Sequence, residues 1–111
     1  MTHTNIKSLP EGKYFTERGY TQAYPWVQIG ETAHTRTLAR VNTAPDPEWK
    51  PEIIPGGFAG HCTNQRQQTW LFDGVDRGYT LTIRKDKRGQ WVHKGVSFKE
   101  DQATYFYDYN F

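Results

Sequence analysis

Tyr79-Thr80-Leu81-Thr82-Ile83-Arg84 alternates apolar with polar side chains and is rich in β-branched residues. This period of two is typical of a strand with one buried face. Residues 85–89 follow as a charged turn ending in glycine, and they lead into a second β-prone run over residues 90–94. Residues 79–94 therefore predict a β-hairpin. The side chains of its first strand that are expected to face inward are Tyr79, Leu81 and Ile83.

The sequence before the hairpin contains further β-prone runs. Strands are expected over residues 13–16, over the aromatic and β-branched residues 24–29, and over the threonine-rich residues 32–43. Alternation in the last of these predicts a sheet with one exposed side. Residues 69–73 indicate another strand, which is expected to end at Asp73-Gly74. In the threonine-rich run, one face is expected to carry Thr35, Thr37, Ala39 and Val41, and the other Arg36, Leu38, Arg40 and Asn42.

Two segments are expected to pack against this sheet. Four prolines within residues 44–55 deny both a helix and a central strand, so this segment predicts an extended connection. Its Trp49, Ile53 and Ile54 indicate that the connection lies on the sheet, because a solvated linker rarely carries such apolar surface. Residues 105–111 alternate aromatic rings and predict a last strand that closes the sheet.

The fold expected from these segments is mainly β with little helix. Residues 1–12 hold few aliphatic side chains and predict a flexible N-terminal arm, followed by one β-rich domain over residues 13–111. Five or six short strands with one long ordered loop predict a small antiparallel barrel or a strongly bent sheet, of SH3-like or related type.

Composition sets outer limits on the function. A chain of 111 residues with a net charge of +2 is expected to form one domain, and the charge is too small to imply a polyanionic partner by itself. A single cysteine cannot form an internal disulfide, and the chain opens without a signal-like segment, so a reducing cytoplasm is expected. Apolar runs fall short of the roughly 20 residues that cross a bilayer, so no membrane partner is expected.

Several motifs carry a resemblance. They are the run Gly56-Gly57-Phe58-Ala59-Gly60-His61-Cys62, the later Asn64-Gln65 and Gln68-Thr69-Trp70, and the ending Phe106-Tyr107-Asp108-Tyr109-Asn110-Phe111. Together with Tyr24-Pro25-Trp26-Val27, they resemble a family of small uncharacterised proteins encoded by bacteriophages and conjugative plasmids. The resemblance implies a mobile-element setting and the cytoplasm of a bacterial host. Small proteins of that setting often act on host machinery, including restriction and CRISPR systems.

The glycine-rich loop is the first candidate site. Its residues are Gly56, Gly57, Phe58, Gly60, His61 and Cys62. A thiol beside an imidazole suggests a nucleophile and its base, but neighbours on an extended chain point to opposite faces, and the alternative is a buried structural thiol. The spacing of cysteine and histidine matches no zinc motif, and the glycines lack the Lys-Ser/Thr of a phosphate loop. We therefore predict no catalytic residue, metal or cofactor.

Binding residues are expected elsewhere. The predicted hairpin tip gathers Arg84, Lys85, Lys87 and Arg88 around one aspartate, and Trp91 follows it. A basic ribbon of this kind can contact phosphates, with an aromatic ring or Arg66 for stacking. The alternative is a solvated turn. Asn64 and Gln65 form a second polar cluster, which either recognises a partner or binds neighbouring main chain.

Three functions follow from these residues. The first is a non-enzymatic mobile-element accessory protein that binds a host protein or nucleoprotein complex, as an inhibitor of host defence of the anti-restriction or anti-CRISPR type. The second is a small β-barrel that binds DNA or RNA through the basic hairpin. The third is a small enzyme dependent on Cys62 and His61, which their adjacency disfavours. An exposed edge strand would also allow a homodimer.

Overall fold

The computed structural model describes residues 2–54 and 61–110. Strands make up 58% of it, and no α-helix occurs within these described residues, so the mainly β prediction is confirmed. In chain order the elements are β1 (His3–Thr4), β2 (Ile6–Lys7), β3 (Tyr14–Arg18), β4 (Ala23–Glu31), β5 (Thr35–Pro45), β6 (Ile53–Ile54), β7 (His61–Cys62), the short 3₁₀ helix η1 (Gln65–Gln67), β8 (Trp70–Lys85), β9 (Trp91–His93), β10 (Val96–Glu100) and β11 (Gln102–Ala103).

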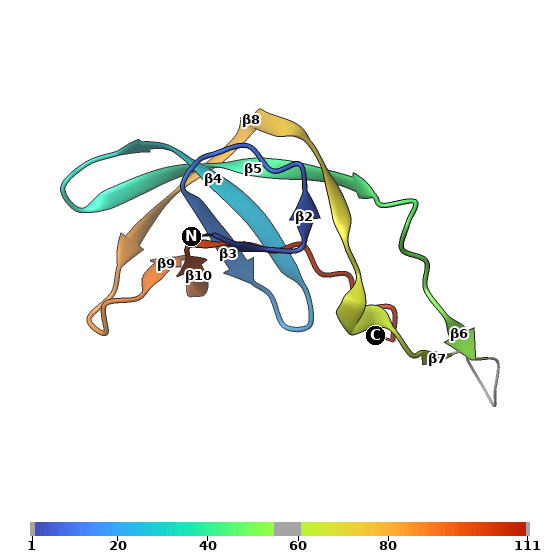
Figure 1. The fold of residues 1–111 in the computed structure, drawn as a ribbon. Coiled ribbons are helices and arrows are strands. Elements are labelled where there is room, and N and C mark those ends of the chain that lie inside the picture. Colours follow the sequence, from blue (N-terminus) through green and yellow to red (C-terminus); the bar gives the residue numbers. More distant parts are fainter. Residues whose placement is uncertain (1, 55–60, 111) are drawn as a thin grey trace.

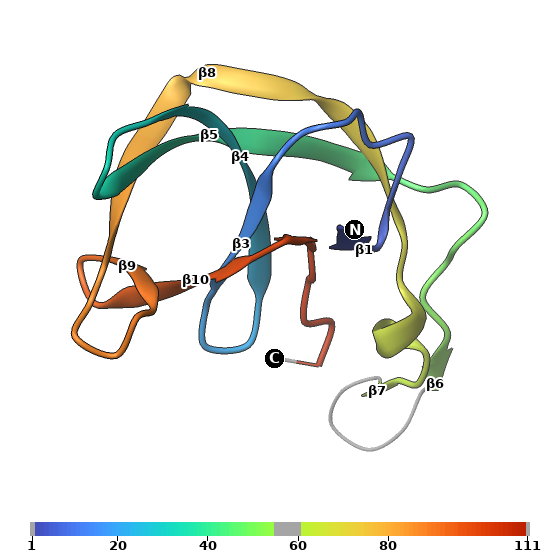
Figure 2. The ribbon, with the colours of Figure 1, turned by 60° about the vertical axis from the view of Figure 1, so that its left-hand side comes forward.

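One sheet organises the molecule. Its strand order is β2-β8-β5-β4-β3-β10-β9, and β8 also pairs with β9, so hydrogen bonds close a ring through six of its seven strands. Figure 2 shows this ring from the side on which β9 and β10 approach β8. Because β2 joins β8 in parallel, the sheet is mixed and has seven strands, whereas an antiparallel sheet of five or six was expected. The hairpin predicted over residues 79–94 is confirmed around its turn, where Arg84 and Lys85 pair with Val92 and Trp91. Of the three side chains expected to face inward, Ile83 is fully buried and Leu81 partly buried, whereas Tyr79 is 53% exposed.

The length of β8 allows the ring to close. The strand runs for 16 residues and continues through Asp73-Gly74, so the strand end predicted there is wrong. Its register against β5 shifts twice, and Gly74 adopts a φ of +92° opposite the second shift. Extra residues of this kind bend and twist a strand. The bends let one strand pair with β5 along nearly its whole length, with β2 at its start and with β9 at its end.

Aromatic rings fill the inside of the ring. Phe15 and Trp91 meet edge to face with centroids 6.1 Å apart, and Trp26 and Phe98 do so at 6.2 Å. Such pairs contribute about 0.5–1.5 kcal/mol beyond the area they bury. The Trp26 indole Nε1 donates to Glu17 Oε1 at 3.0 Å, which satisfies its polar atom. The buried members of this interior cluster are Phe15, Trp26, Leu38, Ile83, Trp91 and Phe98.

A second cluster covers the outer face of the same strands. It joins Ile6, Tyr14, Val41 and Ala103. Tyr14 and its neighbour Phe15 are both buried, one in each cluster, so β3 is covered on both sides. On β5, Leu38 and Ala39 are likewise both fully buried. The sheet with one exposed side that alternation predicted for residues 32–43 is therefore not formed, because the chain termini pack over its outer face.

The N-terminal segment supplies much of this cover. β1 pairs in parallel with β11, and β2 pairs in parallel with β8. Ile6 is only 3% exposed in the second cluster. This pairing differs from the flexible arm expected over residues 1–12. Ile6 and Leu9 both pack in the second cluster, and Lys7 pairs with Asp46 at 2.8 Å, so these contacts dock the segment along the free edge of β8.

The C-terminal tail lies beside the sheet without joining it. The predicted last strand over residues 105–111 is wrong for the described part, where Phe106 forms a single bridge with Ala23. Side-chain amides replace the missing partner strand. The Asn5 side chain accepts the backbone N–H of Tyr105 at 3.1 Å and donates to the Tyr105 carbonyl at 2.7 Å. Gln65 Oε1 accepts the backbone N–H of Tyr109 at 2.9 Å. Gln68 likewise binds both backbone groups of Tyr107, so the amides that bind the tail come from two segments, one at Asn5 and one at η1.

The proline-rich connection behaves as predicted only in part. Trp49 packs against Tyr109, with ring centroids 5.6 Å apart. Ile53 and Ile54 are 51% and 57% exposed, so the expectation that they lie on the sheet is wrong. They form β6, whose partner is β7, in a separate two-stranded sheet. Figure 1 shows this pair projecting beyond the main sheet, at the end opposite β9. No helix in the described ranges is long and apolar enough to span a membrane.

Candidate functional site

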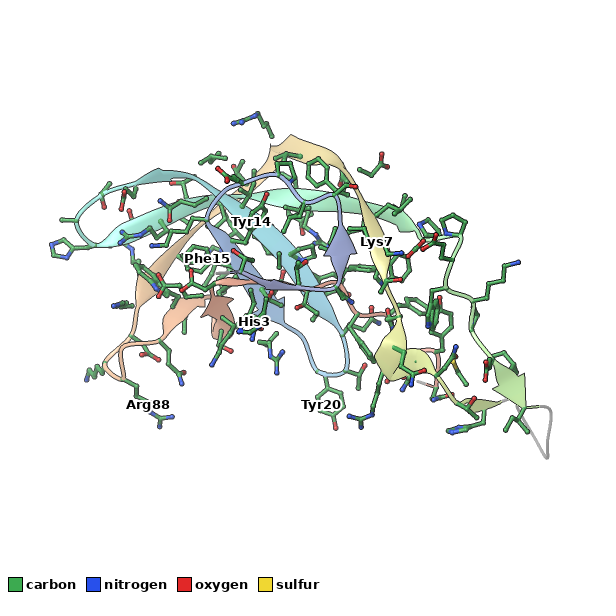
Figure 3. The ribbon with its side chains drawn as sticks, viewed as in Figure 1. His3, Lys7, Tyr14, Phe15, Tyr20 and Arg88 are labelled. Atoms are coloured by element: carbon green, nitrogen blue, oxygen red, sulfur yellow. The ribbon has the colours of Figure 1, made fainter. Side chains whose placement is uncertain are left out.

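The turn between β8 and β9 is held by one carboxylate. Asp86 Oδ1 accepts the N–H groups of Arg88 and Gln90, both at 2.9 Å, and the Asp86 N–H donates to the Gln90 carbonyl at 2.8 Å. Gly89 takes a φ of +79°, which costs little only for glycine. The aspartate thus stabilises the turn through its backbone groups, and Lys87 and Arg88 on the turn are exposed. Figure 3 shows Arg88 extending from this tip away from the ring.

The hairpin cations predicted from the sequence are neighbours at the tip of one hairpin, where Arg84 and Lys85 extend from opposite faces of β8. Arg84, Lys85, Lys87 and Arg88 are all exposed on β8 or on the turn after it. Trp91 differs, since it is only 6% exposed and belongs to the interior cluster. In this structure its indole is a core group and not an exposed platform for stacking bases.

A second hairpin adds a cation that was not assigned to this site from the sequence. Arg36 continues the inward row of β5 beyond Leu38, and Lys85 continues the inward row of β8 beyond Ile83. Their charges converge on one ring: the Arg36 guanidinium carbon lies 4.8 Å from the Trp91 centroid, and Lys85 Nζ lies 5.3 Å from it. The sequence carried a signal for this, because Arg36 and Lys85 each lie two positions from a buried residue of the same strand and therefore share its face. We call the set Arg36, Arg84, Lys85, Lys87 and Arg88 the cationic end.

Two residues of the cationic end, Arg36 and Lys85, line a small hollow. It has a volume of about 190 Å³ and is lined by Ala33, His34, Arg36, Lys85 and Trp91. Arg36 Nη1 donates to the carbonyls of Thr32 and Thr35, at 3.0 and 2.9 Å, and these are the described hydrogen bonds of its guanidinium. The same atom lies 3.5 Å from a carboxylate oxygen of Glu31, which makes an ion pair. Arg36 Nε and Trp91 Nε1 are buried, and neither has a hydrogen-bond partner among the described residues.

The other predicted binding residues lie elsewhere. Asn64, Gln65 and Arg66 belong to η1 and its start, which Figures 1 and 2 place at the opposite end of the molecule from β9. Asn64 binds the Glu52 N–H and the Lys50 carbonyl, both at 2.8 Å. These two contacts, and that of Gln65 with the tail, are with main chain, which fits the alternative in which this polar cluster binds neighbouring backbone. Arg66 is exposed on η1 and so cannot join the hairpin cations in one site.

Cys62 and His61 occupy opposite faces of β7. Cys62 is 2% exposed, while His61 is exposed. The Asn110 side chain binds both backbone groups of Cys62, at 2.8 and 3.0 Å, and the thiol donates to Asn64 Oδ1 at 3.4 Å. These contacts are those of a structural thiol. The remaining loop residues of this candidate, Gly56, Gly57, Phe58 and Gly60, lie outside the described residues.

Metal-ligating side chains do not gather in the described part of the chain. No three residues among its histidines, cysteines, aspartates and glutamates lie in a group that could hold a metal ion. The most perturbed carboxylate is Asp46, whose side chain is almost completely buried. The Lys7 ammonium at 2.8 Å lowers the pKa of Asp46 to about 2, with help from the Thr69 hydroxyl at 2.6 Å. Because this ion pair joins β2 to the end of β5, it is a structural link.

Comparison with known proteins adds no identification. No family model matches the chain, and the searches of curated proteins and of solved structures likewise give no match.

Proposed function

We propose that this protein is a non-enzymatic binding module whose cationic end binds nucleic acid. The observation that carries the proposal is the junction of two hairpins, where β8 and its turn present four exposed cations and β5 brings Arg36 beside Lys85. A basic two-stranded ribbon can contact the phosphates of a groove or of a single strand. The hydrogen-bonded turn at Asp86 supports the proposal because it fixes the direction of the ribbon before a ligand arrives.

The net charge of +2 does not weaken this proposal, because the charges are unevenly placed. Local density of cations, and not the sum over the chain, determines the attraction of a phosphate backbone. The geometry of Cys62 supports the non-enzymatic part of the proposal, since its thiol is buried and His61 is on the opposite face of β7.

Salt-dependent binding tests the proposal. Affinity for a fluorescent single-stranded oligonucleotide is measured by anisotropy over a series of salt concentrations. Each neutralised phosphate adds about −0.7 to the slope of log K against log salt for single strands. The double variant Lys87→Glu/Arg88→Glu is expected to weaken binding and to flatten the slope by about 0.7 for each phosphate that is no longer neutralised. Lys50→Glu, in the connection between β5 and β6, is the control with a charge reversal outside the cationic end. Binding that ignores salt, or that falls equally in the control, rejects the proposal.

A second candidate function is favoured by the turn between β3 and β4. Tyr20 is 99% exposed there, on a turn closed by the Gly19 N–H and the Gln22 carbonyl at 2.9 Å. Figure 3 shows its ring pointing away from the molecule. Exposed tyrosines on rigid turns are typical anchors of protein interfaces. This feature supports the mobile-element accessory protein that binds a host protein or nucleoprotein, as an inhibitor of host defence in the bacterial cytoplasm. Pull-down from bacterial lysate with wild type and with Tyr20→Ala, each with and without nuclease, tests it.

We also propose that the ring of strands is a small β-barrel of SH3-related type. The closed ring of hydrogen bonds and the aromatic interior support this interpretation. An experimental structure tests it through the shear and tilt of the six ring strands.

A further inference from the structure

We infer that the hollow beside Trp91 is a specific pocket for one phosphate group, and this inference deepens the nucleic-acid binding proposed above. The cationic end as a whole offers distributed charge, which suits any polyanion. The hollow differs because it collects His34, Arg36 and Lys85 around one concave space of about 190 Å³. A space of that kind can surround a single anionic group.

The first argument is the placement of two cations over one ring. Arg36 and Lys85 both lie within 5.3 Å of the Trp91 centroid, and they come from separate strands of the sheet. Like charges held together repel each other, and the repulsion is relieved when an anion lies between them. The ion pair of Arg36 with Glu31 offsets little of it, because the distance is 3.5 Å and the Glu31 side chain is 58% exposed.

The second argument is the hydrogen-bonding capacity left in the walls. The described contacts of Arg36 use only Nη1, and they fix the guanidinium against the Thr32 and Thr35 carbonyls. Its Nε is buried and lacks a partner among the described residues, as does Nε1 of Trp91. Arg36 and Trp91 both line the hollow, and the Arg36 guanidinium keeps donors beyond Nη1 that the described residues do not use. A phosphate group supplies acceptor oxygens, and guanidinium binds it in a planar, two-pronged geometry.

The other inward arginine shows what a structural arginine looks like in this ring. Arg40 lies 4.3 Å from the Tyr24 centroid, 5.5 Å from that of Trp26 and 5.9 Å from that of Tyr79. Its charge is covered by three aromatic rings of this chain. Arg36 has one ring, shares it with Lys85, and lines a hollow.

The test uses inorganic phosphate as the probe, with the indole N–H of Trp91 followed by NMR at constant ionic strength maintained with chloride. Phosphate is expected to shift this signal saturably. Lys85→Gln is expected to raise the apparent dissociation constant roughly tenfold, as the removal of one charge-assisted hydrogen bond implies. Lys87→Gln removes the same charge from the turn, outside the hollow, and is expected to change it little. Lys85 is exposed, so its replacement leaves the fold intact, which the amide spectrum verifies. Equal effects of the two variants, or the absence of a saturable shift with phosphate, overturn the inference.

Oligonucleotides then separate the two sources of a phosphate group. A strand with a 5′-phosphate is compared with the same strand ending in a 5′-hydroxyl. Tighter binding of the first assigns the pocket to a terminal phosphate, and equal binding with the same Trp91 shift assigns it to an internal phosphodiester. Salt-dependent binding that leaves the Trp91 signal unmoved overturns the pocket while the proposed function stands. A phosphate-induced shift without oligonucleotide binding supports the pocket and rejects the proposed function.

Discussion

Gln68 binds both backbone polar groups of Tyr107: its Nε2 donates to the Tyr107 carbonyl at 2.9 Å, and its Oε1 accepts the Tyr107 N–H at 2.9 Å. The same side chain also binds the Gln65 carbonyl and the Trp70 indole, both at 2.8 Å. A glutamine that is 2% exposed thereby satisfies all its polar atoms. The buried Gln68 amide therefore supplies Tyr107 of the C-terminal tail with the two backbone hydrogen bonds that a neighbouring strand would supply in a sheet.

Replacing Gln68 by Ala is expected to destabilise the protein by roughly 1–3 kcal/mol, because buried partners lose their hydrogen bonds. The Tyr107 backbone groups and the Trp70 indole are the partners concerned. Urea denaturation measures the change in the free energy of unfolding. Gln67→Ala, an exposed neighbour on η1, is the control and is expected to change it little. A Gln68→Ala midpoint equal to that of the control contradicts the role assigned to the amide.

Acid is expected to weaken the link between β2 and the end of β5. The pKa of Asp46 is lowered to about 2, chiefly by Lys7, from an ordinary value of 3.8. A carboxyl whose pKa is depressed on folding contributes stability that is complete above pH 3.8 and is lost as the pH falls toward 2. Melting temperature is followed by circular dichroism across this window. Asp46→Asn is expected to reduce the dependence on pH, whereas Asp73→Asn, at an exposed position, is expected to leave it unchanged.

Gly74 is expected to tolerate a side chain poorly. A Cβ there meets no described atom within 4 Å, so space is available, but the φ of +92° is unfavourable for other residues. Gly74→Ala is expected to cost about 1–2 kcal/mol of unfolding free energy. Gly30→Ala is the matched control in β4, where the added carbon would make an ordinary contact with Thr37 at 3.8 Å. A smaller loss at Gly74 than at Gly30 contradicts the conformational role of the glycine in the bend of β8.

The thiol of Cys62 is expected to resist alkylation in the folded protein. It is 2% exposed, and its backbone is bound by Asn110. Reaction with a chromogenic disulfide reagent is expected to be slow in buffer and complete in urea. Fast reaction in buffer means that the tail opens readily and that β7 is accessible.

The hairpin of β8 and β9 was predictable because its signals are local. Alternation over residues 79–84 and a turn ending in Gly89 are both read within one short window. Val96-Ser97-Phe98 also alternates, and the preceding Gly95 is a turn signal, so β10 could have been expected there. Gly95 does adopt a positive φ of +81°. The closure of the ring depends on bulges in β8, and no local pattern indicates how far a strand will bend.

The C-terminal tail was not predictable in the same way. Its rings alternate as in a strand, but the groups that bind its backbone come from Asn5, 100 positions away from Tyr105, and from Gln68. Contacts at such separation leave no periodic signal. The candidate site shows the same limit: the exposed cations of the turn were evident, whereas Arg36 joined them only when β5 paired with β8.

The cationic end is tested most directly by mapping a bound oligonucleotide on the backbone amides by NMR. The shifts are expected to concentrate on the two hairpins that form it, over residues 32–36 and 84–93, and to shrink in Lys87→Glu/Arg88→Glu. Shifts confined to the β3–β4 turn around Tyr20 or to η1, or no shifts at low salt, would contradict nucleic-acid binding through the cationic end.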